Sequence, residues 1–165
     1  MIKPLIQKII VAVNGSDQSI RAAMYSILFA KQFNCTVKAV YVVDTAALKQ
    51  LTMTKFFVKD ESKKYEENLI KDGNKYLEYI TTLAKEKGIK IETQLRRGTP
   101  WSEILRAGEE FGADTIFLGG RVHDSSQLSY THDIASATNI EILANAKCNV
   151  LVVRQKEIEK LFKIG

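Results

Sequence analysis

Asn14, Gly15 and Ser16 directly follow the apolar run at residues 9–13, and these residue types at that place are suited to binding an anion. A run of five apolar residues is typical of a strand that is buried on both faces of a parallel sheet. Ser16 is a favoured helix N-cap, and apolar residues follow it at helical spacing. Such a turn brings backbone N–H groups to the carboxyl edge of the sheet, where nucleotide phosphates bind in open α/β folds. The turn is therefore a candidate ribose or phosphate site, and a turn that needs only a cap is the alternative.

A second candidate site is Gly119-Gly120-Arg121, which follows another apolar run. The two glycines are small, so they leave space for a ligand at the carboxyl end of that strand. Arg121 is a candidate partner for a phosphate, with solvent exposure as the alternative. Arg96 and Arg97 end the preceding strand near the same edge; they are candidates for attracting an anion, but a solvated face is the favoured interpretation.

A polar loop is predicted at residues 119–132, and His-Asp occurs twice at this part of the chain, nine residues apart, as His123-Asp124 and His132-Asp133. These types can bind a metal, but a flexible loop rarely supplies the geometry, so a polar lid is the favoured interpretation. No nucleophile, base and acid grouping is recognisable, and neither G-x-x-x-x-G-K-[ST] nor G-x-G-x-x-G occurs. The sequence therefore predicts a binding protein rather than an enzyme, and leaves slow ATP hydrolysis open.

Composition sets limits on the partners of the chain. Its 165 residues are 45% hydrophobic and 26% charged, with a net charge of +5, as is typical of one soluble globular domain. The basic residues form no compact stripe with interleaved aromatics, so we expect no nucleic acid partner. No apolar stretch reaches the roughly 18 residues that span a bilayer, and no signal-peptide pattern is present, so we expect no membrane partner. Two cysteines, Cys35 and Cys148, exclude a disulfide framework and favour a cytoplasmic location.

Strand and helix patterns alternate along the chain. Strands are predicted at residues 8–13, 36–43, 90–95, 114–118 and 150–153. Helices are predicted at residues 19–33, 61–87, 100–111 and 133–146. The last of these helices should place Ile140, Leu143 and Ala144 inward. Residues 44–59 form a less regular connection, and the tail at residues 154–165 is charged, with possible helical character.

This alternation predicts an α/β fold, namely an open, doubly wound, five-stranded parallel sheet with helices on both faces. We expect a single domain over residues 1–165. The strands at residues 8–13 and 114–118 should lie side by side, so that their carboxyl ends form a crevice. Val42 and Val43 are candidates for the wall of an adenine pocket, although buried strand valines need no ligand.

Five short motifs occur in a fixed order along the chain. They are Asn14-Gly15-Ser16, Val42-Val43-Asp44, Gly98 before Thr99-Pro100, Asp114-Thr115-Ile116-Phe117-Leu118-Gly119, and Ala146-Lys147-Cys148-Asn149-Val150-Leu151-Val152-Val153. In this order and spacing the chain resembles the universal stress protein family over nearly its full length. The resemblance implies an adenine nucleotide alpha hydrolase-like fold and a cytoplasmic regulator of the stress response. It also implies ATP as a candidate cofactor, with Mg²⁺ only if ATP binds, and a homodimer formed through the edge strand Val150-Leu151-Val152-Val153.

The chain departs from the ATP-binding pattern of that family, which is a glycine, two residues, a second glycine, nine residues and then Gly-Ser. Gly119 matches the first glycine, Val122 replaces the second, thirteen residues follow, and Ser136-Ala137 replaces Gly-Ser. Asn14 replaces an aspartate that contacts the nucleotide in the family. The resemblance therefore implies a reduced or altered nucleotide site that includes these positions. The alternatives are an ATP-binding member with slow hydrolysis, and a binding module for another small anion or a protein partner.

Overall fold

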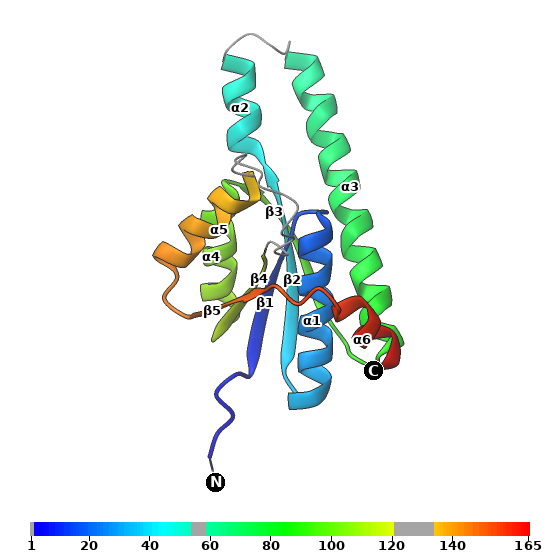
Figure 1. The fold of residues 1–165 in the computed structure, drawn as a ribbon. Coiled ribbons are helices and arrows are strands. Elements are labelled where there is room, and N and C mark those ends of the chain that lie inside the picture. The colour runs from blue at the N-terminus through cyan, green and yellow to red at the C-terminus, as the bar shows by residue number, and fades with distance from the viewer. Residues whose placement is uncertain (1, 54–58, 121–133) are drawn as a thin grey trace, which may run out of the picture.

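The computed structural model describes residues 2–53, 59–120 and 134–165, and its centre is a parallel sheet. The strands are β1 (Lys8–Val13), β2 (Thr36–Asp44), β3 (Glu92–Gly98), β4 (Thr115–Gly119) and β5 (Asn149–Val153). They are all parallel, in the order β3-β2-β1-β4-β5 (Figure 1). The chain builds the sheet outward from β1 in one direction and then returns to add β4 and β5 on the other side. The order therefore reverses between β1 and β4, which lie side by side as predicted.

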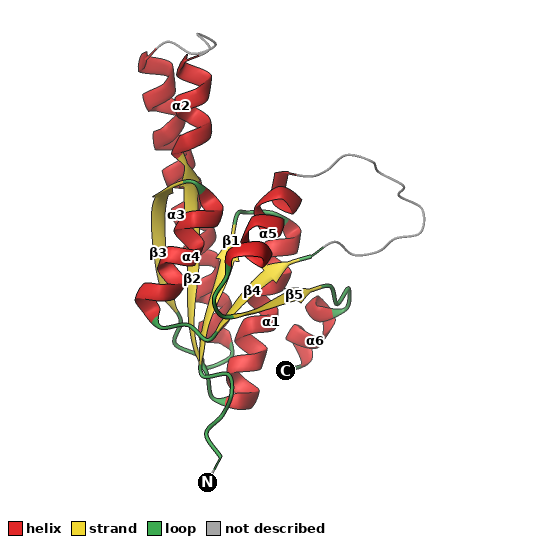
Figure 2. Ribbon diagram, turned by 90° about the vertical axis from the view of Figure 1, so that its left-hand side faces the viewer, coloured by secondary structure: helices red, strands yellow, loops and turns green. Residues whose placement is uncertain are grey.

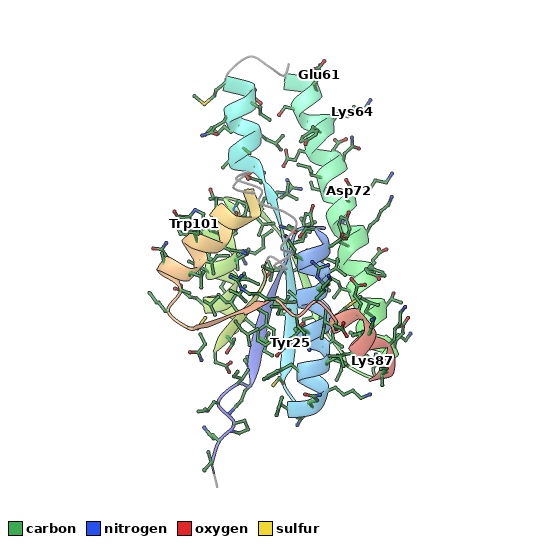
Figure 3. All side chains as sticks on the ribbon, viewed as in Figure 1. Tyr25, Glu61, Lys64, Asp72, Lys87 and Trp101 are labelled. Atoms are coloured by element: carbon green, nitrogen blue, oxygen red, sulfur yellow. The ribbon has the colours of Figure 1, made fainter. Side chains whose placement is uncertain are left out.

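Helices cover both faces of the sheet, as Figure 2 shows. They are α1 (Asp17–Phe33), α2 (Thr45–Met53), α3 (Lys59–Glu86), α4 (Pro100–Phe111), α5 (Ile134–Asn145) and α6 (Ile158–Ile164). Side chains of α1, α3 and α6 pack on one face, and those of α4 and α5 pack on the other. Tyr25 marks the first layer and Trp101 the second in Figure 3. The predicted α/β doubly wound fold is confirmed.

The two-sided cover explains the apolar run in β1. Ile9 and Val11 face the α1 and α3 layer, whereas Ile10 faces α4 and α5, and all three are fully buried. A strand that is buried on both faces has no polar face, so its sequence shows no alternation.

α2 and the first turns of α3 project beyond the carboxyl edge of the sheet (Figure 1). The sequence predicted a less regular connection here, but α2 is a helix, which begins where the Ala47 amide donates to Asp44 Oδ1 at 2.9 Å. α3 has 28 residues, or about 42 Å at 1.5 Å per residue. Thr52 and Ser62 join the two helices through their hydroxyl groups, 3.1 Å apart. The projecting helices therefore form a wall beyond the carboxyl edge of the sheet.

Three further expectations need correction or confirmation. Ile140 and Leu143 were predicted inward, but they are 59% and 53% exposed, Ala144 is exposed as well, and Ile142 is fully buried. Apolar residues occur on every side of this helix, so periodicity could not select the inward face. The third strand begins and ends later than predicted, at Glu92–Gly98. The tail is helical as expected, and Phe162 of α6 is buried against the core.

Candidate functional site

The carboxyl edge of the sheet contains a step between neighbouring strands. Val13 ends β1 opposite Tyr41, whereas β2 continues past Tyr41 to Asp44. The step leaves a cleft of about 330 Å³ over the ends of β1 and β4, walled by β2, the first turn of α1 and the projecting helices α2 and α3. Its volume lies at the lower end of the range of roughly 300–1,000 Å³ found for ligand pockets. The crevice predicted between the two strand tips is confirmed.

The turn after β1 is closed by hydrogen bonds among its own side chains. Asn14 Oδ1 accepts from the Ser16 backbone N–H at 3.0 Å and from the Ser16 hydroxyl at 2.6 Å. The Ser16 hydroxyl oxygen in turn accepts from the Ser19 N–H at 3.2 Å, which makes Ser16 the N-cap of α1, as predicted. The Ser19 hydroxyl accepts from the Asn14 N–H at 3.2 Å and donates to the Ser16 carbonyl at 2.9 Å. The two serine hydroxyl groups, the Asn14 side-chain oxygen and the backbone N–H groups of Asn14, Ser16 and Ser19 therefore bind one another.

Gly15 is required by the shape of this turn. Its φ is +84°, and a Cβ at this position would lie 2.6 Å from the ring of Tyr76. Tyr76 is stacked on Tyr41, with ring centroids 6.2 Å apart, and Gly73 of α3 leaves room for the Tyr41 ring. Burial, and secondarily the carboxylate of Asp72, raises the pKa of Tyr41, so its hydroxyl stays protonated. Gly15 shapes the turn but is not among the residues that line the cleft.

Gly119 and Gly120 allow close packing at the end of β4. A Cβ on Gly119 would lie 2.5 Å from the Gln18 carbonyl group, so the glycine brings the strand tip against the first turn of α1. The Gly119 carbonyl accepts from Asn139 Nδ2 at 2.9 Å. A Cβ on Gly120 would lie 2.4 Å from Val152 Cγ1. The backbone N–H of Gly120 donates to the Val153 carbonyl at 2.9 Å. Of the two glycines, Gly119 lines the cleft.

The wall that β2 forms is apolar up to Asp44, an acidic residue at the end of the strand. Val42 and Val43 both line the cleft, as the adenine-pocket prediction requires, and Val43 is also part of the core. Asp44 is the one charged residue among the described residues that line the cleft. Its Oδ1 accepts the Ala47 N–H, so the carboxylate is fixed in place by the start of α2.

Arg96 and Arg97 are both engaged by carboxylates. The Arg96 side chain is only 10% exposed, and it donates to Glu103 at 2.9 Å and to Glu110 at 2.8 Å. The hydrogen bond to Glu110 raises the pKa of Arg96 further above its ordinary value, although burial opposes this. Arg97 lies 3.4 Å from Glu66. For Arg96, both the anion-attracting and the solvated interpretation were wrong, because α4 supplies partners that the local sequence does not reveal.

Metal binding and thiol chemistry find no support in the part of the chain that the structure describes. No group of three or more His, Cys, Asp or Glu side chains there is arranged to hold a metal ion, and the two His-Asp pairs lie outside that part. Burial raises the pKa of both Cys35 and Cys148, which disfavours the reactive thiolate. Among residues 2–53, 59–120 and 134–165, no helix combines the length and apolar character that a membrane crossing requires.

Comparison with known proteins decides the family. Residues 5–154 match the universal stress protein family. The chain belongs to that family. A universal stress protein of Methanocaldococcus jannaschii is 30% identical over 155 residues, which make up 94% of this chain and 86% of the relative. The resemblance inferred from the five motifs is thereby confirmed.

Solved universal stress proteins share the fold. A family member from Burkholderia pseudomallei has a TM-score of 0.70 at 20% identity, with 93% of this chain and 99% of that chain covered. The universal stress protein from Archaeoglobus fulgidus in complex with dAMP has a TM-score of 0.59 at 15% identity, with 90% and 98% covered. At these identities the likeness concerns the fold alone.

Some of the site residues that were predicted from the family motif do not line the cleft. Arg121 lies outside the described residues, as does the side chain of Ser136, and Ala137 is exposed but does not line the cleft. α5 contributes Thr138 and Asn139 instead. The cleft is also lined by Leu48, Leu51, Tyr65 and Leu69 of the two projecting helices, which the sequence showed as apolar positions but not as site residues. Asp44 could have been found, because an acidic residue directly after a buried strand falls at the ligand-binding edge.

Proposed function

We propose that the protein is a cytoplasmic universal stress protein that acts as a regulator by binding an adenine nucleotide or nucleoside in the cleft and by forming a homodimer. The observation that carries the proposal is the cleft at the point where the strand order reverses, because ligands of open α/β sheets bind there. The family structure with dAMP supports an adenine compound as the ligand.

The lining of the cleft suits the nucleoside end of such a ligand. Val42 and Val43 offer apolar walls to a flat base, and Asp44 offers a carboxylate to a hydroxyl or amino group. Asn139 and Gln18 supply further polar groups at the tips of β4 and α1. ATP is a candidate ligand, with Mg²⁺ bound only through its phosphates. Among the described residues of this lining, no base is paired with a nucleophile, and we expect regulation by binding and not by turnover.

The homodimer would form through β5 at the edge of the sheet. β5 is hydrogen-bonded to β4 on one side, and it comes last in the strand order, so its other edge can pair with another strand. α5, which leads directly into β5, exposes Ile140 and Leu143. An apolar helix face next to an open edge strand fits a second copy of this chain, since a two-fold interface is self-complementary.

Calorimetric titration with adenine compounds tests the ligand proposal. We expect binding heat with the unmodified protein, and its loss in Ala47→Trp, because Ala47 lines the cleft and a tryptophan there would fill it. Ala46→Trp is the matched control, since Ala46 is exposed in the same helix and is not part of the lining. Absence of heat from adenosine, AMP and ATP alike at millimolar concentration would refute an adenine ligand.

A further inference from the structure

The cleft differs from a phosphate site in how its polar groups are used. We propose that its described lining binds the nucleoside part of the ligand and adds no affinity for phosphate groups, so that adenosine binds as tightly as ATP. This inference rests on the proposed function, because it refines which adenine compound the same cleft holds. Three independent features of the described residues support it.

The first feature is the turn between β1 and α1. A phosphate at a helix N-terminus is held by free backbone N–H groups and hydroxyl donors. Here the N–H and the hydroxyl of Ser16 both donate to Asn14 Oδ1, at 3.0 and 2.6 Å. The Ser19 N–H donates to the Ser16 hydroxyl oxygen at 3.2 Å, and the Asn14 N–H donates to Ser19 at 3.2 Å. An incoming phosphate would have to break this network before it gained these donors. The network does not use the backbone N–H groups of Asp17 and Gln18, but the Asp17 carboxylate in the same turn repels a phosphate.

The second feature is the end of β4. The Gly120 N–H donates to the Val153 carbonyl at 2.9 Å, which uses the donor next to the strand tip. Gly119 is packed so closely on Gln18 that even a Cβ would lie 2.5 Å from the helix backbone. The smallness of these glycines therefore serves the packing of β4 against α1 and β5. The Gly119 carbonyl, which also faces this region, is an acceptor and is bound to Asn139.

The third feature is the charge and polarity of the lining. Asp44 is its one charged residue within the described part of the chain, and a carboxylate repels phosphate groups while it accepts hydrogen bonds from neutral hydroxyl and amino groups. On the side of the projecting helices, Leu48, Leu51 and Leu69 present apolar surface, with Tyr65 beside them. This combination fits an uncharged aromatic base with a sugar better than a polyanion.

Calorimetry with adenosine, AMP and ATP, the last with and without Mg²⁺, tests the inference on the full chain. We expect the dissociation constants of the three compounds to agree within about threefold. A dissociation constant for ATP that is lower than that of adenosine by more than about threefold overturns the inference and leaves the proposed function intact. If none of the compounds binds, the proposed function fails and the inference fails with it.

Two variants test the cause. Asn14→Ala removes the acceptor of both Ser16 donors, so ATP should gain at least about threefold over adenosine relative to the unmodified protein. Asp44→Asn keeps the acceptor for the Ala47 N–H and removes the charge, and it should also raise the relative affinity for ATP by about threefold. Asn145→Ala, an exposed position outside the cleft, is the control and should leave the ratio unchanged. If both test variants also leave the ratio unchanged, the internal network and the carboxylate do not set the selectivity, and the inference is overturned.

Discussion

Arg96 Nε lies 2.9 Å from Glu103 Oε2, and the two side chains are only 10% and 12% exposed. The pair joins the end of β3 to the first turn of α4. Between them lies Gly98, where a Cβ would be 2.9 Å from Glu103 Cγ, so the glycine permits the close approach. Pro100 begins α4 and lines the cleft. The ion pair therefore fixes the position of one wall of the candidate site.

Breaking this pair should cost far more stability than breaking the neighbouring one. Arg96→Met leaves Glu103 largely buried, with the exposed Arg106 as its remaining cationic partner, so we expect a loss of about 2 kcal/mol in the free energy of unfolding. Arg97→Met removes a pair in which Arg97 is 59% exposed, and should cost less than about 1 kcal/mol. Urea unfolding of both variants measures the difference. Equal losses would show that the burial of Arg96 has no energetic role.

The carboxylate of Glu110 should make this region sensitive to acid. Its hydrogen bond to Arg96 lowers the pKa of Glu110 below the ordinary value of 4.5. A carboxyl whose pKa is lowered by folding contributes stability above its unfolded-state pKa and loses that contribution as the pH falls through the folded-state value. The unmodified protein should thus be more stable than Glu110→Gln at pH 7, and the difference should shrink at low pH, as the pH falls below 4.5 and through the lowered pKa of Glu110. Urea midpoints at pH 7 and at low pH provide the measurement, and a difference that persists undiminished at low pH would contradict the assignment.

Gly119 and Gly108 make a matched pair for testing close approach. Gly119→Ala forces a Cβ to within 2.5 Å of the Gln18 backbone, so we expect a loss of about 1–3 kcal/mol from the shift of β4 against α1. Gly108 lies inside α4, where a Cβ would make an ordinary contact 3.7 Å from Ile116, so Gly108→Ala should be neutral or stabilising by up to about 1 kcal/mol. Thermal unfolding compares them. A neutral Gly119→Ala would mean that β4 and α1 can move apart freely.

The two N-caps of α1 and α4 differ in one hydrogen bond. The Ser16 hydroxyl accepts from the Ser19 N–H, whereas the Thr99 side chain makes no capping hydrogen bond. Ser16→Ala should therefore cost about 1 kcal/mol, and Thr99→Ala only a few tenths of that. Chemical denaturation gives both values. A larger loss in Thr99→Ala would show that the side-chain bond is not what stabilises the start of these helices.

The parallel sheet, the neighbouring position of β1 and β4 and the cleft at their tips could be predicted, because they follow from local patterns and the rules for open α/β sheets. Buried parallel strands appear as apolar runs, as in β1, and the alternation with helices implies the crossover rule. The N-cap at Ser16 was also readable from the sequence, because capping depends on residues that are close along the chain.

Features that depend on distant contacts could not be predicted. Arg96 looks exposed in a charged strand end, but its partners lie 7 and 14 residues later in α4. α5 is apolar on several sides, so only the packed structure shows that Ile142 faces inward and Ile140 outward. The apolar wall from Leu48 and Tyr65 requires α2 and α3 to project past the sheet, which depends on how the two helices pack together.

The exposed apolar face of α5 leads to a prediction about assembly. At micromolar concentration we expect the unmodified protein to sediment as a dimer, with twice the chain mass of 18.6 kDa. Ile140→Glu combined with Leu143→Glu would place two carboxylates in the contact, where unpaired charges are costly to bury, so this variant should sediment as a monomer.

Tyr79→Glu on α3 is the control, because Tyr79 is 48% exposed and lies on the other layer of the fold, and it should leave the dimer intact. Dissociation by the control as well would point to a general loss of folding, which circular dichroism would detect. A dimer that survives the α5 variant would place the contact elsewhere, because β5 and α5 are adjacent in the chain and a two-fold interface through this edge brings both into contact with the partner.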